Sequence, residues 1–337
     1  MTIDKTRNIL IFKPGAIGDL LHLTPVIREL NRKFPDARIT LIVGSTISVD
    51  IFRNNPLVHE VIIYSKNGEH RSLSAFADLW LRLRSRHFDL VINYQRSNIK
   101  GWILMSATFP CRVLVYHKSR RSIVHAIVDH LRPLTVLEID PYTVDQKLDF
   151  FPLPEDEEYA DRFISEQHLA GKRLIAFNPG TSHASKCWPI EQFAVLADRL
   201  AAEHGCEIIV VGSSHEMPLA TAIRDGMHHQ MHDLCGCSLG ELGALLKRTE
   251  FLVTGDTGPM HIASSVGTRV LALYGPISPE RSGPVGEGHQ IIMHNELDCC
   301  PCNRFDCKNR SFRLCMEMIT VDEVAQIAAE MLHNRLD

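Results

Sequence analysis

Several features that would place a chain in a simple class are missing from this sequence of 337 residues. It has no basic surplus, because 36 Lys and Arg stand against 40 Asp and Glu, and the net charge of −4 argues against a protein that binds nucleic acid. No apolar run reaches the length of a membrane span, and no stretch like a signal peptide follows Met1. Low-complexity segments and short repeats are absent as well. We therefore expect a globular protein of the cytoplasm.

What the sequence does contain is a recurring unit, in which a short apolar strand leads through a small-residue turn into an amphipathic helix. The strands are rich in Val, Ile and Leu without alternation, as in a parallel sheet that is covered on both faces. We predict strands at 8–12, 39–43, 61–64, 90–94, 112–116, 174–178, 207–212, 251–255, 270–274 and 290–294. Helices are predicted at 25–34, 73–86, 190–204, 217–225, 239–248 and 260–266.

Two such series imply an α/β protein with two doubly wound, Rossmann-like domains. The proline-containing stretch between 139 and 171 marks the boundary, and we expect domains over 1–150 and 151–320. The segment 321–337 is expected to form a helix that packs back on one of the domains, the first being the candidate. Ligands of open α/β sheets bind beyond the carboxyl ends of the strands, so the strand-to-turn junctions are the places to look for function.

The first junction places Gly15 and Gly18 directly after a strand, where a tight turn lets the backbone approach a ligand. Its pattern is not G-x-G-x-x-G, so we do not interpret it as a dinucleotide fingerprint. Asp19 has two interpretations. It is either the N-cap of the next helix, or a carboxylate at the mouth of a cleft that can take a proton from an acceptor hydroxyl.

The second junction offers the hydroxyls and amides of Thr181 and Ser182 and the positive charge of Lys186. The next helix begins after Trp188 and Pro189, with proline in its favoured early position. Such a loop can hold a diphosphate and neutralise the charge that grows as the diphosphate departs. An ordinary solvated loop with a surface lysine is the other interpretation.

The third junction follows Gly212, which ends a strand of the second half. Glu216 opens the next helix and is either a ligand of ribose hydroxyls or a first-turn acid favoured by the helix dipole.

The fourth junction puts the amides of Thr257 and Gly258 at a helix N-terminus, which is a ready-made anion site. Asp256 would repel a phosphate, so we expect it to face sugar hydroxyls or to brace the loop. His261 lies in the first helical turn and is either a ligand group or a packed core histidine.

Taken in order, these motifs resemble glycosyltransferase family 9, the ADP-heptose:lipopolysaccharide heptosyltransferases of the GT-B architecture, and heptosyltransferase II in particular. The motifs are Gly18-Asp19 with His22 and Pro25, Lys186 before Trp188-Pro189, and Asp256-Thr257-Gly258 with His261. The resemblance extends over nearly the whole chain. It implies two Rossmann-like domains facing a central cleft, with the acceptor on the first and the nucleotide sugar on the second.

The resemblance also implies a role for each motif residue. Asp19 falls on the catalytic base of a single displacement with inversion, and Lys186 on the lysine that contacts the phosphates and sugar of an ADP-sugar donor. Asp256 matches the acidic residue near the donor heptose, and Glu216 matches the ribose contact. The family needs no metal, and we expect no cofactor. The rest of the expected donor site is Thr181, Ser182, Gly212, Thr257, Gly258 and His261.

On the acceptor side we expect Gly18, Arg96 and Arg120, with Lys118 and Arg121 nearby. Cationic side chains can pair with the carboxylates and phosphates of a lipid-linked, inner-core oligosaccharide. The same residues could assist a transient, peripheral contact with the inner membrane face. A solvated basic surface without a ligand is the alternative.

Five of the ten cysteines crowd into one segment, from Cys299 and Cys300 to Cys315. Cys299-x-x-Cys302 has metal-ligand spacing, and Cys307 and Cys315 could complete a structural zinc or iron–sulfur site. No histidine pair or second C-x-x-C completes a standard zinc pattern, so we favour reduced thiols packed in a loop. We expect no catalytic role for them.

Other functions share parts of this pattern. An NAD-dependent oxidoreductase would need a dinucleotide fingerprint and an acidic residue after the second strand, but that strand ends in Val43-Gly44-Ser45. A nucleotide-sugar epimerase would share the phosphate turn without the Gly18-Asp19 signature. A metal-dependent interaction protein would explain the cysteines and leave the junctions without a purpose. Within the family, another nucleotide sugar or another acceptor also fits.

Overall fold

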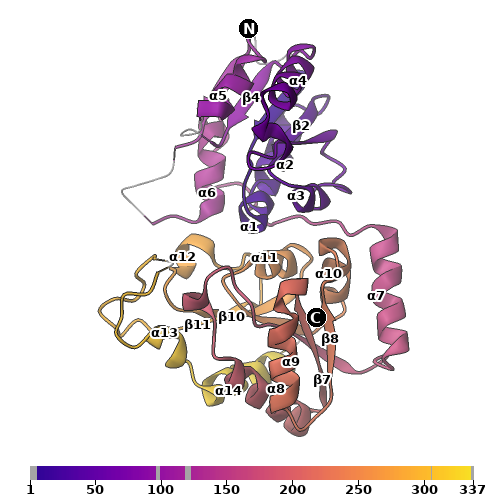
Figure 1. The fold of residues 1–337 in the computed structure, drawn as a ribbon, viewed down its shortest axis with the longest axis vertical. Coiled ribbons are helices and arrows are strands. Elements are labelled where there is room, and N and C mark those ends of the chain that lie inside the picture. Colours follow the sequence, from indigo (N-terminus) through magenta and orange to yellow (C-terminus); the bar gives the residue numbers. More distant parts are fainter. Residues whose placement is uncertain (1–5, 96–98, 118–122, 305, 335–337) are drawn as a thin grey trace. The chain divides into compact units, whose positions relative to one another are not determined.

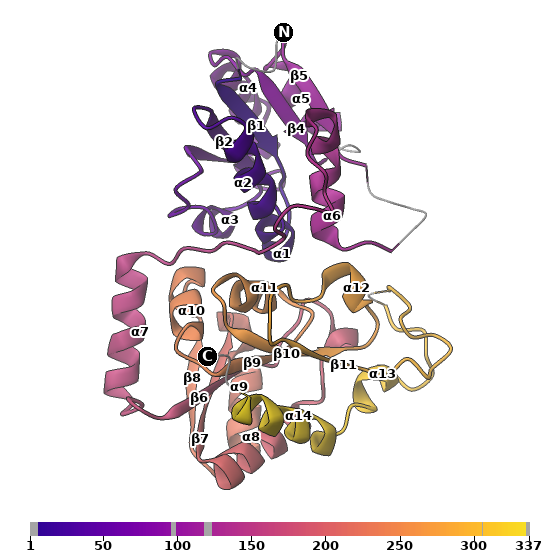
Figure 2. The same cartoon turned by 180° about the vertical axis from the view of Figure 1, so that it is seen from behind.

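The computed structural model describes residues 6–95, 99–117, 123–304 and 306–334. The chain divides into two compact units, residues 1–151 and 152–337, which we describe one at a time. Each unit is a parallel sheet with helices packed against its two faces (Figures 1 and 2). The predicted class, α/β with two doubly wound Rossmann-like domains, is confirmed.

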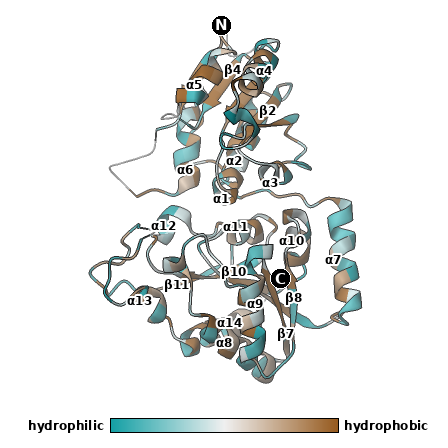
Figure 3. Cartoon of the chain, in the orientation of Figure 1, coloured by the Kyte–Doolittle hydropathy of each residue, from teal (hydrophilic) through white to brown (hydrophobic). Residues whose placement is uncertain are grey.

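The sheet of the first unit has the order β3-β2-β1-β4-β5, and all of its pairings are parallel. Its strands are apolar and almost continuously buried, so both faces must be covered, and Figure 3 shows hydrophobic ribbon along β4. The strands are β1 (Asn8–Phe12), β2 (Arg38–Val43), β3 (Glu60–Ile63), β4 (Leu90–Asn93) and β5 (Arg112–Val115). The helices are α1 (Ile17–Leu21), α2 (Thr24–Lys33), α3 (Thr46–Asp50), α4 (Leu73–Arg84), α5 (Ile99–Ser106) and α6 (Ala126–Leu131).

The sheet of the second unit has the order β11-β10-β9-β6-β7-β8, again with parallel pairings throughout. Its strands are β6 (Arg173–Asn178), β7 (Cys206–Gly212), β8 (Met231–Cys235), β9 (Phe251–Gly255), β10 (Arg269–Tyr274) and β11 (Gln290–Met293). Its helices are α7 (Pro154–Glu166), α8 (Ile190–His204), α9 (Met217–Gly226), α10 (Leu239–Leu246), α11 (Gly258–Ser265), α12 (Pro279–Ser282), α13 (Leu314–Glu317) and α14 (Val321–His333).

The ten predicted strands all form, and their bounds agree to within one residue. β8 was not predicted, because it carries His232 and Asp233 in its middle and therefore does not look like a buried strand. β8 is the edge of its sheet, and the imidazole of His232 is satisfied by Gln167 and Glu207. An edge strand tolerates such polar residues because only one of its sides is paired.

The C-terminal helix forms, and of the two domains on which it was expected to pack it lies on the second and not on the first. The apolar face of α14 belongs to the core of the second unit, where Val324, Ala328 and Leu332 lie among residues of α8 and the sheet. The carbonyl of Leu332 also accepts a hydrogen bond of 2.7 Å from Arg173 at the start of β6. An amphipathic pattern shows which face is buried but not against which partner.

In each sheet the first strand of the unit lies in the interior, and the strands that follow are added first on one side of it and then on the other. β1 lies between β2 and β4, and β6 lies between β7 and β9. At such a topological switch point the loops after the two central strands diverge to opposite faces of the sheet and leave a crevice. The loops that follow β1 and β4, and those that follow β6 and β9, are therefore placed to bind ligands.

Candidate active site

At the switch point of the second unit, a buried asparagine ties three strands together. The Nδ2 of Asn178, at the end of β6, donates to the carbonyl of Val211 in β7 at 3.1 Å. Its Oδ1 accepts hydrogen bonds of 3.1 Å from the hydroxyls of Thr254 and Thr257. Asn178 is 1% exposed, so these bonds are made away from water. This residue was not among the predicted site residues, although a polar residue closing a buried strand is the signal that could have found it.

The turn after β9 is the fourth predicted junction. Thr257 is the N-cap of α11 and Gly258 is its first residue, so the helix begins two residues before the predicted start. The hydroxyl of Thr257 lies 3.1 Å from that of Thr254 and is held by Asn178, which leaves the first-turn amides of α11 at the edge of the sheet. Unpaired amides at a helix N-terminus and the helix dipole favour an anion.

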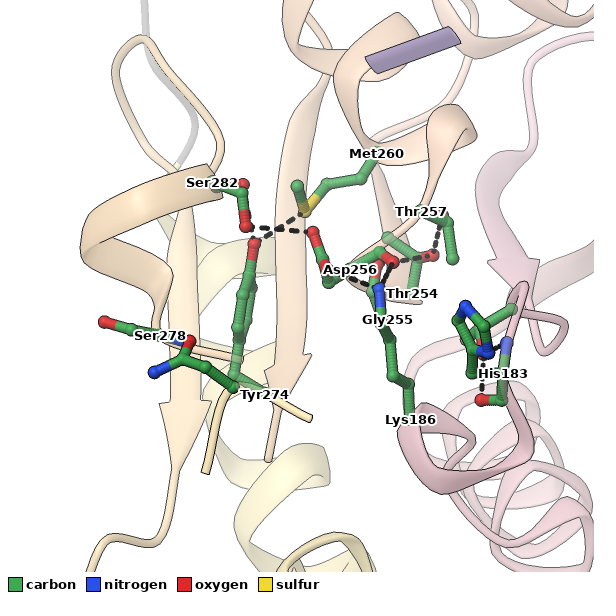
Figure 4. Close-up of polar contacts among 12 residues, drawn as sticks. His183, Lys186, Thr254, Gly255, Asp256, Thr257, Met260, Tyr274, Ser278 and Ser282 are labelled. Atoms are coloured by element: carbon green, nitrogen blue, oxygen red, sulfur yellow. Dashed lines mark hydrogen bonds and ion pairs between the residues drawn. The ribbon is translucent and has the colours of Figure 1, made fainter. Parts of the chain in front are cut away.

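Lys186 points into this turn and pairs with the acidic residue next to it (Figure 4). Its ammonium nitrogen lies 2.7 Å from Oδ2 of Asp256 and 3.4 Å from the carbonyl oxygen of the same residue. The two side chains are 9% and 15% exposed. Asp256 therefore braces the loop, one of the two roles predicted for it, and it orients the lysine while partly balancing its charge.

The other carboxylate oxygen of Asp256 is held from the far side (Figure 4). The hydroxyl of Ser282, at the end of α12, donates to Oδ1 of Asp256 at 3.0 Å. The carbonyl of Ser282 in turn accepts a hydrogen bond of 2.7 Å from the hydroxyl of Tyr274, at the end of β10. Burial and the nearby charge of Asp256 raise the pKa of Tyr274 well above its usual range, so this hydroxyl stays a donor. No motif pointed to Ser282 or Tyr274.

The loop after β6 is stabilised by contacts among its own residues. The hydroxyl of Thr181 donates to the carbonyl of His183 at 2.7 Å and lies 3.3 Å from Sγ of Cys187. Ser182 next to it is exposed, and Lys186 ends a 3₁₀ turn that starts at Ala184. The alternative of a surface lysine is wrong, because this turn directs Lys186 inward, where it is 7% exposed.

Glu216 packs against Gly180, in the loop after β6, and against Gly212, the last residue of β7. A Cβ atom added to Gly180 would lie 1.5 Å from Oε1 of Glu216, and one added to Gly212 would lie 2.9 Å from Oε2. The carboxylate accepts a hydrogen bond of 2.6 Å from the amide of Ser213 in a capping box. Glu216 therefore has the role at a helix start that was one of its two predicted roles, and its contact with a ribose stays a prediction. His261 is 4% exposed in α11, as expected of a packed histidine.

In the first unit, Asp19 is the third residue of α1, and Ala16 is the N-cap of that helix. The capping alternative for Asp19 is therefore wrong. Its side chain is 48% exposed, and Oδ2 lies 3.6 Å from the ammonium nitrogen of Lys13, whose side chain is 9% exposed. The absence of a side chain at Gly15 makes room for both, since a Cβ there would lie 3.1 Å from Cε of Lys13 and 3.4 Å from Cβ of Asp19.

A polar pocket of about 430 Å³ opens at the carboxyl end of the same sheet. It is bounded by the loops after β1 to β4, and the buried hydroxyl of Tyr64 at its wall has no hydrogen-bond partner among the described residues. Gln95 closes one side, where its side-chain amide donates to the carbonyl of Pro14 at 3.1 Å. The residues that face the pocket include Gly15, Ser45, Tyr64, Ser65, Lys66 and Gln95.

Gly18, also predicted on the acceptor side, is the second residue of α1, directly before Asp19. The predicted acceptor residues Arg96 and Arg120, with Lys118 and Arg121, lie outside the described residues. The pocket itself was not predicted, because its lining comes from four loops that are separate in the chain.

The cysteine-rich segment packs against the loop that follows β10. All ten cysteines are free thiols, and within the described ranges no three His, Cys, Asp or Glu side chains are arranged to hold a metal ion. The thiol of Cys300 donates to the carbonyl of Gly275 at 3.1 Å, and Asn303 bonds to the backbone of Pro276 and Ser278. The segment therefore supports the stretch that leads to Ser282.

Comparison with known proteins identifies the family. The model of glycosyltransferase family 9 (heptosyltransferase) matches residues 76–312. The chain belongs to this family. It is therefore a glycosyltransferase, and the predicted resemblance is confirmed, whereas the oxidoreductase and the metal-dependent interaction protein are excluded as its family.

Curated relatives of this glycosyltransferase align over most of their length. It is 25% identical over 302 residues to the lipopolysaccharide core heptosyltransferase OpsX of Haemophilus influenzae, covering 85% of this chain and 84% of that one. It is 24% identical over 332 residues to lipooligosaccharide heptosyltransferase 2 of Campylobacter jejuni, covering 97% and 98%.

Solved structures of the family share its GT-B fold. A glycosyltransferase of family 9 from Veillonella parvula superposes with a TM-score of 0.87 at 24% identity, covering 99% of both chains. The ADP-heptose lipopolysaccharide heptosyltransferase II of Escherichia coli superposes with a TM-score of 0.76 at 19% identity, covering 97% of this chain and 98% of that one. As for membrane segments, the helices in the described part of the chain are all too short or too polar to cross a bilayer.

Proposed function

We propose that this glycosyltransferase moves a heptose from ADP-L-glycero-D-manno-heptose to an inner-core lipopolysaccharide acceptor, with inversion at the anomeric carbon and without a metal ion. The observation that carries the donor half of this proposal is the buried Lys186–Asp256 pair beside the N-terminus of α11. The names of the aligned relatives, which are heptosyltransferases of lipopolysaccharide or lipooligosaccharide, support the sugar and the acceptor.

The second unit would bind the donor. The ammonium of Lys186 and the amides that follow Asp256 neutralise the charge that builds up on the diphosphate as ADP leaves. Asp256 holds the lysine in place and can face a heptose hydroxyl. Glu216, lying between Gly180 and Gly212, is placed at the strand ends where the ribose of a nucleotide binds in folds of this type.

The first unit would bind the acceptor and supply the base. Asp19 is half exposed and so can reach a substrate, and Lys13 keeps a positive charge 3.6 Å from its carboxylate. In the reaction Asp19 takes the proton of the acceptor hydroxyl, the oxygen attacks the anomeric carbon, and the bond to the diphosphate breaks on the opposite face. The pocket that contains Lys66, Ser65 and Gln95 offers a cation and hydrogen-bonding groups for an anionic sugar.

Isothermal titration with ADP-heptose, ADP, UDP and NAD tests the donor. We expect the protein to bind ADP-heptose and ADP, and to bind neither UDP nor NAD. A preference for UDP would keep a glycosyltransferase but reject the heptose donor, and binding of NAD alone would reject the proposal.

The Asp19→Ala variant tests the mechanism. It should bind ADP-heptose as the unmodified protein does but transfer no heptose to an inner-core lipopolysaccharide acceptor. The unmodified protein should transfer heptose equally well with and without EDTA. Asp36→Ala is the matched control, because Asp36 is an exposed carboxylate of the same unit that pairs with Arg7 at the surface. Normal transfer by a folded Asp19→Ala variant would contradict the assignment of the base.

A further inference from the structure

Two neighbouring helices of the first unit expose an unusual amount of apolar surface. The exposed fractions are 87% for Leu73 and 59% for Leu81 on α4, and 77% for Ile99 and 49% for Ile103 on α5. Phe109, just after α5, is 43% exposed. Large apolar side chains gathered on one surface mark an interaction site more often than isolated ones do. We call these five residues, with Trp80 and Trp102, the α4–α5 patch.

The seven side chains form one surface because the two helices cover the same face of the sheet. Phe76 and Leu83 of α4 and Leu104 of α5 pack into one core cluster. On the outward side of that cluster, the indole nitrogen of Trp80 donates to the hydroxyl of Ser106 in α5 at 3.2 Å. Figure 3 shows α5 as a mainly hydrophobic ribbon.

Helical spacing puts the exposed residues on one side of each helix. Leu73, Ala77 and Leu81 follow one another at intervals of four residues on α4, as do Ile99 and Ile103 on α5. At the end of α4, Arg84 donates a hydrogen bond to the carbonyl of Phe109, which brings that residue to the same edge.

The segment of the chain that carries the patch is basic. Residues 69–112 contain seven Lys and Arg against three Asp and Glu, although the whole chain is net negative. Glu60 pairs with both Arg82 and Arg86 and so leaves a net positive charge there. Arg71 and Lys100 are exposed at the starts of α4 and α5. Exposed apolar side chains with a basic rim complement an anionic lipid surface, where the chains enter the interface and the cations meet the headgroups.

We propose that the α4–α5 patch docks this protein on an anionic phospholipid membrane. The two indoles suit such a surface, because tryptophan prefers the boundary between headgroups and acyl chains. The inference rests on the proposed function in one respect, namely that a lipid-linked acceptor gives the docking a purpose. The patch lies in the first unit, which would bind that acceptor.

Tryptophan fluorescence and vesicle sedimentation of the full chain test the proposal. Two of the three tryptophans are in the patch, and the third, Trp188, is only 3% exposed in the core of the second unit. We expect a blue shift and cosedimentation with vesicles that contain phosphatidylglycerol, and neither with vesicles of phosphatidylcholine alone. Trp80→Phe and Trp102→Phe should each reduce the shift.

A variant with Leu73→Ser, Leu81→Ser, Ile99→Ser and Ile103→Ser should lower the partition coefficient at least about tenfold. The matched control is Val195→Ser in α8 of the second unit, whose side chain is 55% exposed and which should bind vesicles normally. Thermal unfolding verifies that both variants are folded. Equal vesicle binding by the two variants, or equal binding to neutral and anionic vesicles, would overturn the proposal. So would light scattering that shows a dimer which only the patch variant loses.

A transfer assay separates this proposal from the proposed function. The patch variant should use a water-soluble acceptor fragment normally and lose transfer to the same acceptor in vesicles. Loss of transfer to both acceptors by the folded variant would overturn the docking role. If the unmodified protein transfers no heptose at all, the proposed function fails, while the vesicle measurements still decide whether the patch binds lipid.

Discussion

In the second unit, the ammonium nitrogen of Lys186 lies 2.7 Å from Oδ2 of Asp256, although the two residues are 70 positions apart in the chain. The lysine comes from the loop after β6 and the aspartate from the turn after β9, which are neighbours because those strands pair in the middle of the sheet. The ion pair thus joins the two loops of the switch point. The pair holds the ammonium of Lys186 at the site where we propose that the diphosphate binds.

Lys186→Met removes that charge and leaves the buried carboxylate of Asp256 without its cation. We expect a loss of about 3 kcal/mol in the free energy of unfolding, and a fall in kcat by about a hundredfold or more. Denaturant titration and steady-state kinetics measure the two effects. Adding Asp256→Asn should restore most of the stability but not the activity, and a Lys186→Met variant with normal kcat would show that the lysine is only structural.

Ser282→Ala removes the hydroxyl that donates to the other oxygen of Asp256. The carboxylate then loses one of its two anchors and holds Lys186 less well. We expect kcat to fall about fivefold, as for the loss of a hydrogen bond of about 1 kcal/mol, with the KM for the acceptor unchanged. Ser282→Thr keeps the hydroxyl and should recover the rate. Equal kinetics for the Ala and Thr variants would contradict the positioning of Asp256 by Ser282.

Gly180→Ala would push a methyl group into the place of the Glu216 carboxylate. Glu216 must then turn away from the amide of Ser213, and we expect a higher Kd for ADP with little change in kcat. Titration calorimetry of a double-mutant cycle with Glu216→Ala measures the coupling. If Gly180 acts through Glu216, the second change adds little to the first, whereas full additivity would mean that Gly180 contacts the nucleotide by another route.

Asp198 in α8 holds the segment after α9 and makes stability depend on pH. Its carboxylate accepts hydrogen bonds of 2.8 and 2.9 Å from the amides of His228 and His229, and it lies 2.8 and 3.0 Å from their Nδ1 atoms. Partial burial works against ionisation, but these donors more than offset it and hold the pKa of Asp198 well below its usual range. A carboxylate with a lowered pKa stabilises the folded state fully above its unfolded pKa of about 4, and the contribution is lost as the pH falls further.

We therefore expect Asp198→Asn to lower the free energy of unfolding by about 2 kcal/mol at neutral pH. The difference from the unmodified protein should shrink as the pH drops below about 4. Urea titrations over a pH series measure it, and Asp225→Asn, an exposed carboxylate in α9, is the control. A difference that stays constant down to low pH would show that the carboxylate charge is not the cause.

The sequence by itself determined the fold class and the order of ten of the eleven described strands. Short continuous apolar runs that end in small-residue turns indicate strands buried on both faces, and the ten strands that have this pattern were found to within one residue. The family also followed from the sequence, because its motifs stand at strand ends in a specific order, from Gly18-Asp19 to Asp256-Thr257-Gly258. β8 was missed because His232 and Asp233 interrupt its apolar pattern.

Only the tertiary structure decided which groups meet. Lys186 and Asp256 were both predicted site residues, yet their ion pair follows from the pairing of β6 with β9, a long-range contact that no local pattern specifies. Asn178, Tyr274 and Ser282 carry no motif, and they act through bonds to residues of other strands and loops. Tertiary structure also decided that α14 packs on the second unit and that the apolar side chains of the α4–α5 patch are exposed. Periodicity tells which face of a helix is apolar, and only packing tells whether that face is covered.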